Sequence, residues 1–142
     1  MSRVINPDSA GKQRNQHIRT IAEILRHLTQ KPEMDAEAKD MIATMVYCLR
    51  DIDNGIEVSA EAWEKRDYWL KADELRTRWG WAGQTADQLQ GVLLEDKWDQ
   101  MPQLMLKILP HVKDVTITRL MRKPEDWFGN YARLLSERPP TK

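Results

Sequence analysis

Hydrophobic residues recur every three or four positions through most of the chain, which is the period of an α-helix that packs on one side. The alternation of hydrophobic and polar residues that marks a half-buried strand is nearly absent. The first periodic segment lies between Pro7 and Pro32, and its hydrophobic residues share one face: Ile18, Ile21, Ala22, Leu25 and Leu28. The pattern therefore predicts an all-α protein whose first helix ends at Pro32.

The second and third helices are predicted on either side of a short polar segment. Asp35 is a suitable N-cap for the second helix because its carboxylate can accept a hydrogen bond from a first-turn amide. The segment Asp53–Gly55 predicts the end of this helix, since asparagine and glycine accept the left-handed backbone conformation of a helix end. Ser59 is the predicted N-cap of the third helix, which is expected to end near Trp79.

Shorter helices are predicted in the second half of the chain. Thr85 is the predicted N-cap of the fourth helix. Pro102 suits the first turn of the fifth helix, which Pro110 should end or kink. The β-branched run at 115–118 is interpreted as a short helical turn, and Pro124 is predicted to open the last helix.

The composition is that of an ordinary globular protein: of 142 residues, 41% are hydrophobic and 31% are charged. A chain of this length buries enough surface for one domain, and neither a linker nor a repeat divides it. We therefore expect residues 1–142 to form a single all-α bundle of about six helices, with frayed ends at 1–10 and 138–142. Because no hydrophobic run is long enough for a membrane span or a secretory signal, the prediction is a cytoplasmic protein without a membrane partner.

Tryptophans concentrate in two neighbouring segments, AWEKRDYWL at 62–70 and RTRWGWAG at 76–83, which hold four of the six in the chain. At about 100° per residue, the predicted third helix carries one hydrophobic stripe, while Trp63 and Leu70 lie on nearly the opposite side. Trp81 would join them there if the helix continued through Gly80. Such a helix either packs between two layers of the bundle or offers its second face to a partner, which includes a second copy of the chain.

The second of these interpretations identifies candidate interface residues. Tryptophan and arginine are enriched among the residues that contribute most to binding at protein interfaces. Trp63, Arg66, Leu70 and Trp81 are therefore the candidate partner-binding residues. The corresponding functional hypothesis is a non-catalytic protein-interaction module, either a homodimer or a small subunit of a larger assembly.

Charge composition adds a second hypothesis, which is nucleic-acid binding. Lys and Arg together number 22, as do Asp and Glu, so only a local basic surface could attract a polyanion. Two basic groups occur, one in the first helix and one near the C-terminus: Lys12, Arg19, Arg26, Arg119, Arg122 and Lys123. If the fold places the two groups side by side, they could neutralise several phosphates.

Residues suited to catalysis or metal binding are sparse. The single cysteine, Cys48, lies beside the hydrophobic stripe of the second helix and is predicted to be a small core residue. His17 and His27 are nearly three turns apart on the first helix, too far to share an ion. No nucleotide-binding glycine loop occurs, and we expect neither a cofactor nor a metal ion.

Acidic residues nevertheless support a third hypothesis. Glu61-x-x-Glu64-x-x-Asp67 and Glu37-x-x-Asp40 resemble the magnesium-binding acids of all-helical nucleotide pyrophosphohydrolases, although that family has its Glu-x-x-Glu before its Glu-x-x-Asp. The resemblance implies metal-dependent hydrolysis of nucleotides. The reversed order places this hypothesis below the other two.

Overall fold

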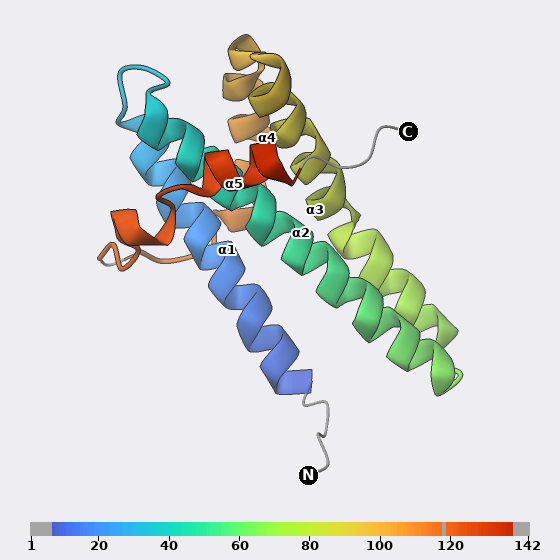
Figure 1. Cartoon of the computed structure of the whole chain (residues 1–142). Helices are drawn as coiled ribbons and strands as arrows, with labels where there is room; N and C mark the ends of the chain where they lie inside the picture. Colours follow the sequence, from blue (N-terminus) through green and yellow to red (C-terminus); the bar gives the residue numbers. More distant parts are fainter. Residues whose placement is uncertain (1–6, 118, 138–142) are drawn as a thin grey trace.

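The computed structural model describes residues 7–117 and 119–137 (Figure 1). The described residues form helices joined by turns and irregular segments, with no strand, which confirms the predicted all-α class. The α-helices are α1 (Pro7–Thr29), α2 (Ala36–Lys65), α3 (Trp69–Glu95), α4 (Met101–Val112) and α5 (Asn130–Ser136). Two 3₁₀ turns, η1 (Trp98–Gln100) and η2 (Pro124–Asp126), precede α4 and α5. None of the described helices is long and apolar enough to cross a membrane.

The two longest helices, α2 and α3, form an antiparallel hairpin to which the other helices attach (Figure 1). α1 packs along α2, α4 packs against α1 and α3, and α5 crosses α2. The turn between α2 and α3 lies at the far end from α4 and α5, where the hairpin stands clear of them (Figure 1). This arrangement presents the turn to solvent.

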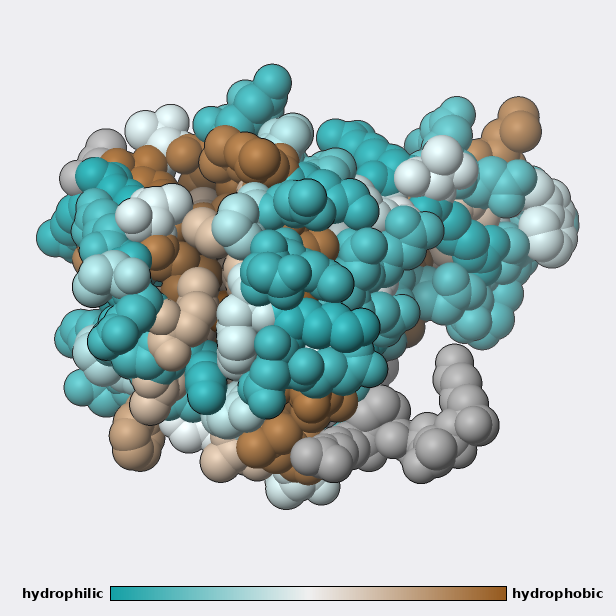
Figure 2. All heavy atoms as spheres, turned by 90° about the horizontal axis from the view of Figure 1, so that it is seen from above, coloured by the Kyte–Doolittle hydropathy of each residue, from teal (hydrophilic) through white to brown (hydrophobic). Residues whose placement is uncertain are grey.

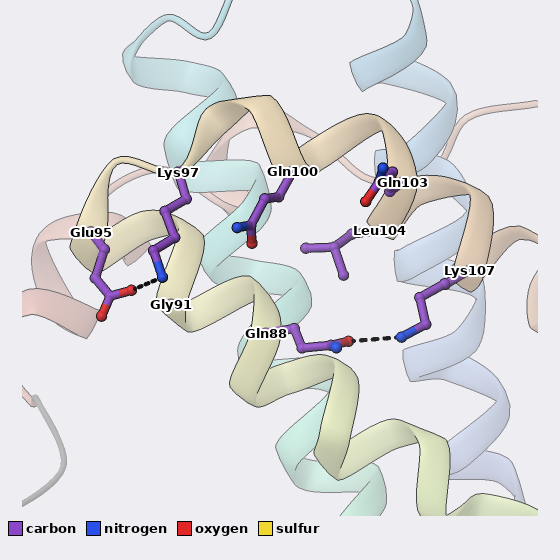
Figure 3. Close-up of a pocket in the computed structure, with 8 residues that line it drawn as sticks. All are labelled: Gln88, Gly91, Glu95, Lys97, Gln100, Gln103, Leu104 and Lys107. Carbon is purple, nitrogen blue, oxygen red and sulfur yellow. Dashed lines mark hydrogen bonds and ion pairs between the residues drawn. The ribbon is translucent and has the colours of Figure 1, made fainter.

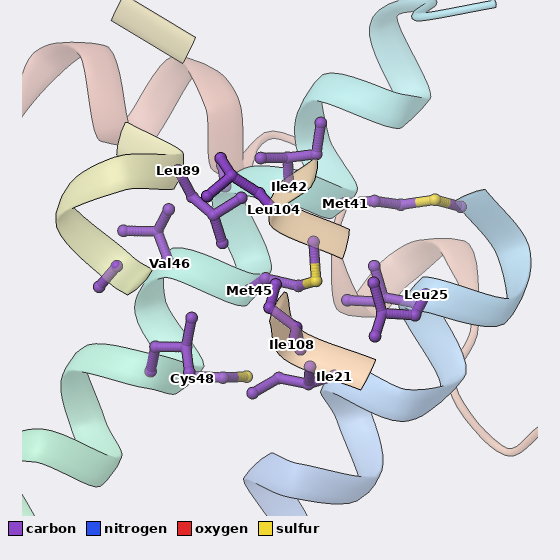
Figure 4. Close-up of a cluster of buried hydrophobic side chains, with 14 of the residues drawn as sticks. Ile21, Leu25, Met41, Ile42, Met45, Val46, Cys48, Leu89, Leu104 and Ile108 are labelled. Atoms are coloured by element: carbon purple, nitrogen blue, oxygen red, sulfur yellow. The ribbon is translucent and has the colours of Figure 1, made fainter. Parts of the chain in front are cut away.

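The hydrophobic core lies where α1, α2, α3 and α4 meet (Figure 4). Side chains from all four helices pack together there: Ile21, Leu25, Met41, Ile42, Met45, Leu89, Leu104 and Ile108. Burial of each such side chain stabilises the fold by roughly 1.5–3 kcal/mol. Cys48 belongs to the same cluster with 7% of its surface exposed, which confirms its prediction as a core residue.

The predicted end of the second helix at Asp53–Gly55 is wrong, because α2 continues to Lys65. Ile52 and Ile56 are buried on both sides of this segment. A glycine inside a helix costs about 1 kcal/mol, less than the gain from burying one isoleucine. Packing along the hairpin therefore outweighs the local preference, and Ser59 lies inside α2 rather than at a helix start.

The chain instead reverses at residues 66–68. Asp67 has a left-handed φ of 63°. The Tyr68 amide donates to the Trp63 carbonyl at 2.9 Å, and the Asp67 amide donates to the Glu64 carbonyl at 3.0 Å. These two bonds form a Schellman motif, in which aspartate takes the position usually held by glycine.

The structure joins the end of the predicted third helix and the whole predicted fourth helix in α3. Thr85 is therefore a buried residue inside α3 and not an N-cap. Gly83, on the same helix, lies where a Cβ atom would come within 2.9 Å of the Asp53 carboxylate on α2. The absence of a side chain at Gly83 therefore leaves room for the Asp53 carboxylate against α3.

Three further details differ from expectation in the last part of the chain. Residues 115–117 are irregular rather than helical, and residue 118 lies outside the described residues. The helix predicted from Pro124 is divided into η2 and α5 by Gly129, whose φ is 85°. Pro110 lies inside α4, which ends two residues later.

The expected chain ends are tested only in part. Of the N-terminal segment predicted to fray, residues 7–10 belong to α1. Residues 1–6 and 138–142 lie outside the described residues.

The predicted N-cap of the second helix is confirmed, because Asp35 Oδ1 accepts the Ala38 amide at 2.8 Å.

Candidate interaction site

Three of the four candidate partner-binding residues meet at the turn between α2 and α3, which we call the hairpin tip (residues 63–71). Trp63 lies in the last turn of α2, Arg66 is the C-cap of that helix, and Leu70 lies in the first turn of α3. The sequence placed these residues on one predicted helix. Their proximity arises instead from a chain reversal between two helices.

Large hydrophobic side chains are exposed at the hairpin tip. Leu70 is 79% exposed, Trp69 58% and Tyr68 48%. They border a shallow hollow of about 310 Å³ that residues 67–71 line. In the view of Figure 2 the surface is mostly hydrophilic and its hydrophobic side chains form separate patches. Exposed hydrophobic groups that lie side by side are typical of binding surfaces.

Cations order the aromatic rings of the hairpin tip. Trp63 and Tyr68 meet edge to face with ring centroids 5.5 Å apart. The Arg66 guanidinium lies 5.3 Å from the Trp63 centroid and 5.5 Å from that of Tyr68. Lys71 Nζ lies 4.7 Å from the Trp63 centroid. Contacts of this kind between cations and rings fix the rings at the base of the tip.

Arg76 clamps the hairpin behind the tip. Its Nε and Nη2 atoms donate to Glu57 at 3.1 and 2.8 Å, and its Nη1 and Nη2 atoms donate to Glu64 at 2.6 and 3.1 Å. The hydrogen bonds from Arg76 lower the pKa of both glutamates and raise the pKa of the arginine. Both glutamates lie on α2, so one guanidinium on α3 joins the two helices at two points.

Trp81, the fourth candidate, is not part of the hairpin tip. It lies in the middle of α3, and its ring stacks on that of His111 from α4, with centroids 3.8 Å apart. The prediction that Trp81 shares a face with Trp63 was wrong, because the two residues belong to different helices.

The two basic groups of the nucleic-acid hypothesis are adjacent. The irregular segments 113–117 and 119–123, which we together call the strap, contact α1. Arg19 Nη2 donates to the Arg119 carbonyl at 3.1 Å, and Arg26 Nη1 donates to the Ile117 carbonyl at 3.5 Å. Arg122 Nε in turn donates to Thr20 Oγ1 of α1 at 2.8 Å. The guanidinium groups of Arg19, Arg26 and Arg122 therefore hold the strap on α1.

The two lysines of that hypothesis differ from its arginines. Lys12 on α1 and Lys123 at the end of the strap are exposed. In the described part of the chain, neither lysine lies within 4.0 Å of a carboxylate. Both lysines are thus exposed and lack a carboxylate partner among the described side chains.

Three acids of the hydrolase hypothesis, Glu37, Asp40 and Glu64, take part in other bonds. Glu64 binds Arg76, and Asp67 forms the turn. Glu37 binds Lys31 Nζ at 2.8 Å, and Asp40 Oδ1 accepts the backbone amide of Tyr131 at 2.9 Å. Within 7–117 and 119–137, no three side chains of His, Cys, Asp or Glu lie close enough to hold a metal ion.

A polar cavity of about 380 Å³ lies between α3 and α4 (Figure 3). Its one carboxylate, Glu95, is bound to Lys97 at 2.7 Å, and Lys107 donates to Gln88 Oε1 at 3.4 Å. The remaining lining residues are Gly91, Gln100, Gln103 and Leu104. Because none of these groups pairs a nucleophile with a base, the cavity does not suggest a reaction.

Tyr68, Trp69, Lys71 and Arg76 belong to the hairpin tip or its clamp and were not among the predicted site residues. All four lie in or beside the tryptophan-rich segments. Asp67 is the residue that could have revealed this site. A chain reversal predicted at Asp67 would have placed its neighbours at the exposed end of a hairpin.

Comparison with models of known protein families, with curated proteins and with solved structures finds no match to this chain. Function is therefore inferred from the surface of the molecule itself.

Proposed function

We propose that this chain is a non-catalytic protein-interaction module and that the hairpin tip is its contact surface. One observation supports this most directly: Trp69 and Leu70, 58% and 79% exposed, are adjacent at the free end of a clamped hairpin. Leaving two large hydrophobic side chains in water forgoes the burial energy they would gain in a core. A partner that covers them recovers this energy.

The charges around the tip indicate what the partner presents. Lys65, Arg66 and Lys71 are exposed. In the described residues none of the three lies within 4.0 Å of a carboxylate. The best complement is a hydrophobic pocket with acidic residues at its rim. Such a pocket on another protein, or on a second copy of this chain, fits the proposal equally.

The native mass of complexes isolated from host cells tests this function. Leu70→Ser should remove the partner, because it replaces the most exposed large side chain of the tip by a polar one. Leu106→Ser is the matched control, since Leu106 is also strongly exposed, at 68%, but lies on α4. A wild-type mass of two chains would indicate a homodimer, and a larger non-integral mass would indicate another subunit. A wild-type protein that is monomeric at every concentration and without a bound protein would contradict the proposal.

Nucleic-acid binding remains a second candidate because the two basic groups lie side by side on α1 and the strap. Lys123 is the best probe, since Arg122 is needed to hold the strap. If this surface binds a polyanion, Lys123→Glu should weaken binding and reduce the dependence of log K on log salt by about 0.7–0.9. Lys65→Glu, the same charge change at the hairpin tip, should have no such effect. Equal effects of the two variants would exclude the strap as the binding surface.

A further inference from the structure

A continuous stack of planar groups joins α1, α3 and α4. The Arg14 guanidinium of α1 lies 5.2 Å from the ring centroid of Trp79 on α3. Trp79 stacks on Trp81 with centroids 6.1 Å apart, and Trp81 stacks on His111 of α4 with an angle of 7° between the rings. His111 is exposed at the end of this series. A further flat ring can therefore extend the stack beyond the imidazole.

Positive charge accompanies the stack without an ion-pair partner among the described residues. Arg78 lies beside Trp79 on α3, and in the described residues neither Arg14 nor Arg78 has a carboxylate within 4.0 Å. Partial burial and the repulsion of Arg78 lower the pKa of Arg14. An anion bound by either guanidinium group would offset this repulsion.

The stack borders a hollow of about 170 Å³ that Arg78, Trp79, Trp81 and His111 line. Three of these four residues are aromatic, and the fourth carries a charge. Partial burial lowers the pKa of His111, which favours the uncharged ring at neutral pH. An uncharged aromatic ring is a suitable surface for stacking a base.

From this arrangement we infer that the stack of Trp79, Trp81 and His111 binds a nucleobase and that Arg78, which lines the same hollow, holds the phosphate attached to its sugar. Arg14, at the opposite end of the stack, contacts a further phosphate when the base belongs to a strand. Proteins hold unpaired bases by stacking them on Trp, His or Arg and hold the backbone with basic side chains. The ligand is a free nucleotide or one unit of a single strand, since both present the same base and phosphate. This site is separate from the hairpin tip and from the strap.

Binding of a fluorescent oligothymidylate of about 12 nucleotides, followed by anisotropy at several salt concentrations, tests the site. Contacts of two arginines with phosphates predict a slope of log K against log salt near −1.4. The same protein is then titrated with UMP while the NMR signals of the His111 ring are recorded. Binding of UMP identifies a free nucleotide as a ligand, and binding of the oligonucleotide alone identifies a strand. If neither probe binds the folded protein at low salt, the inference is wrong.

Variants locate the binding on the molecule. His111→Ala should weaken oligonucleotide binding by about five- to a hundredfold, whereas His111→Phe, which keeps a ring, should retain it. Arg78→Glu should weaken binding and lower the salt slope by about 0.7, while Lys123→Glu on the strap should not. Circular dichroism checks that each variant is folded. Unchanged binding by folded His111→Ala, or a larger loss with Lys123→Glu than with Arg78→Glu, would overturn the assignment.

Discussion

The carboxylate of Glu23 accepts a hydrogen bond from the backbone amide of Arg122 at 2.8 Å, although 99 positions separate the two residues in the chain. The same oxygen accepts the Met121 amide at 2.6 Å, and the other oxygen accepts Arg19 Nε at 3.0 Å. Glu23 is fully buried in α1. One buried carboxylate therefore supplies the acceptor that two amides of the irregular strap require.

Glu23→Gln should release the strap. Glutamine keeps the size of the side chain, but its NH₂ group cannot accept a hydrogen bond and would face either the two amides or the Arg19 guanidinium. We expect the free energy of unfolding to fall by about 1–3 kcal/mol, measured by urea denaturation. Amide exchange at Met121 and Arg122 should accelerate in parallel. Glu125→Gln, on exposed η2, should change neither quantity, and an unchanged stability of Glu23→Gln would contradict this role.

Gly55→Ala should stabilise the protein by about 1 kcal/mol, because Gly55 lies inside α2 and a Cβ atom there meets nothing within 4 Å. Were Gly55 the left-handed end of a helix, the same substitution would destabilise the protein. Urea denaturation therefore decides by the sign of the change whether α2 passes through this residue.

Asp67→Gly is the counterpart at the true turn. Asp67 has a φ of 63°, and relief of this left-handed strain should raise the free energy of unfolding by up to about 1 kcal/mol. Glu61→Gly, a control inside α2, should lower it by about 1 kcal/mol. Similar losses for both variants would mean that the chain does not reverse at Asp67.

Arg76→Lys should loosen the hairpin tip without unfolding the core. A lysine carries the charge but cannot bind both Glu57 and Glu64 with paired hydrogen bonds. Hydrogen exchange followed residue by residue should become faster between Glu57 and Arg76 and stay unchanged in α1. Uniform acceleration over the whole chain would show instead that Arg76 supports the entire fold.

The Cys48 thiol should be unreactive in the folded protein. Burial raises its pKa to about 12, so the thiolate that attacks an alkylating reagent is scarce at pH 8. We expect alkylation to be at least about a hundredfold slower than in urea, and to become faster as the pH approaches that value. Rapid alkylation at pH 8 without denaturant would contradict the burial of Cys48.

Periodicity predicted the helices whose ends carry local signals. The first helix, the N-cap at Asp35 and the core position of Cys48 are as expected. The ends that depend on packing between distant segments were not predictable in this way. Burial of Ile56 keeps α2 helical through Gly55, and an aspartate with a left-handed backbone ends it.

The wrong position of the helix end also affected the predicted interaction site. Because Trp63 and Trp81 were placed on one helix, they were assigned to one face. The structure retains Trp63, Arg66 and Leu70 as neighbours for a different reason, their position around a turn. The adjacency of α1 and the strap, by contrast, depends on the buried Glu23, whose role no local pattern indicates.

The most direct measurement of the central claim is photo-crosslinking in host cells from a reactive amino acid placed at position 70. The same amino acid at position 106 is the control, because Leu106 is 68% exposed on another helix. If the hairpin tip is the contact surface, position 70 should yield one discrete product, a second copy of the chain or another protein, and position 106 should not. The absence of a product from position 70, or identical products from both positions, would contradict the account.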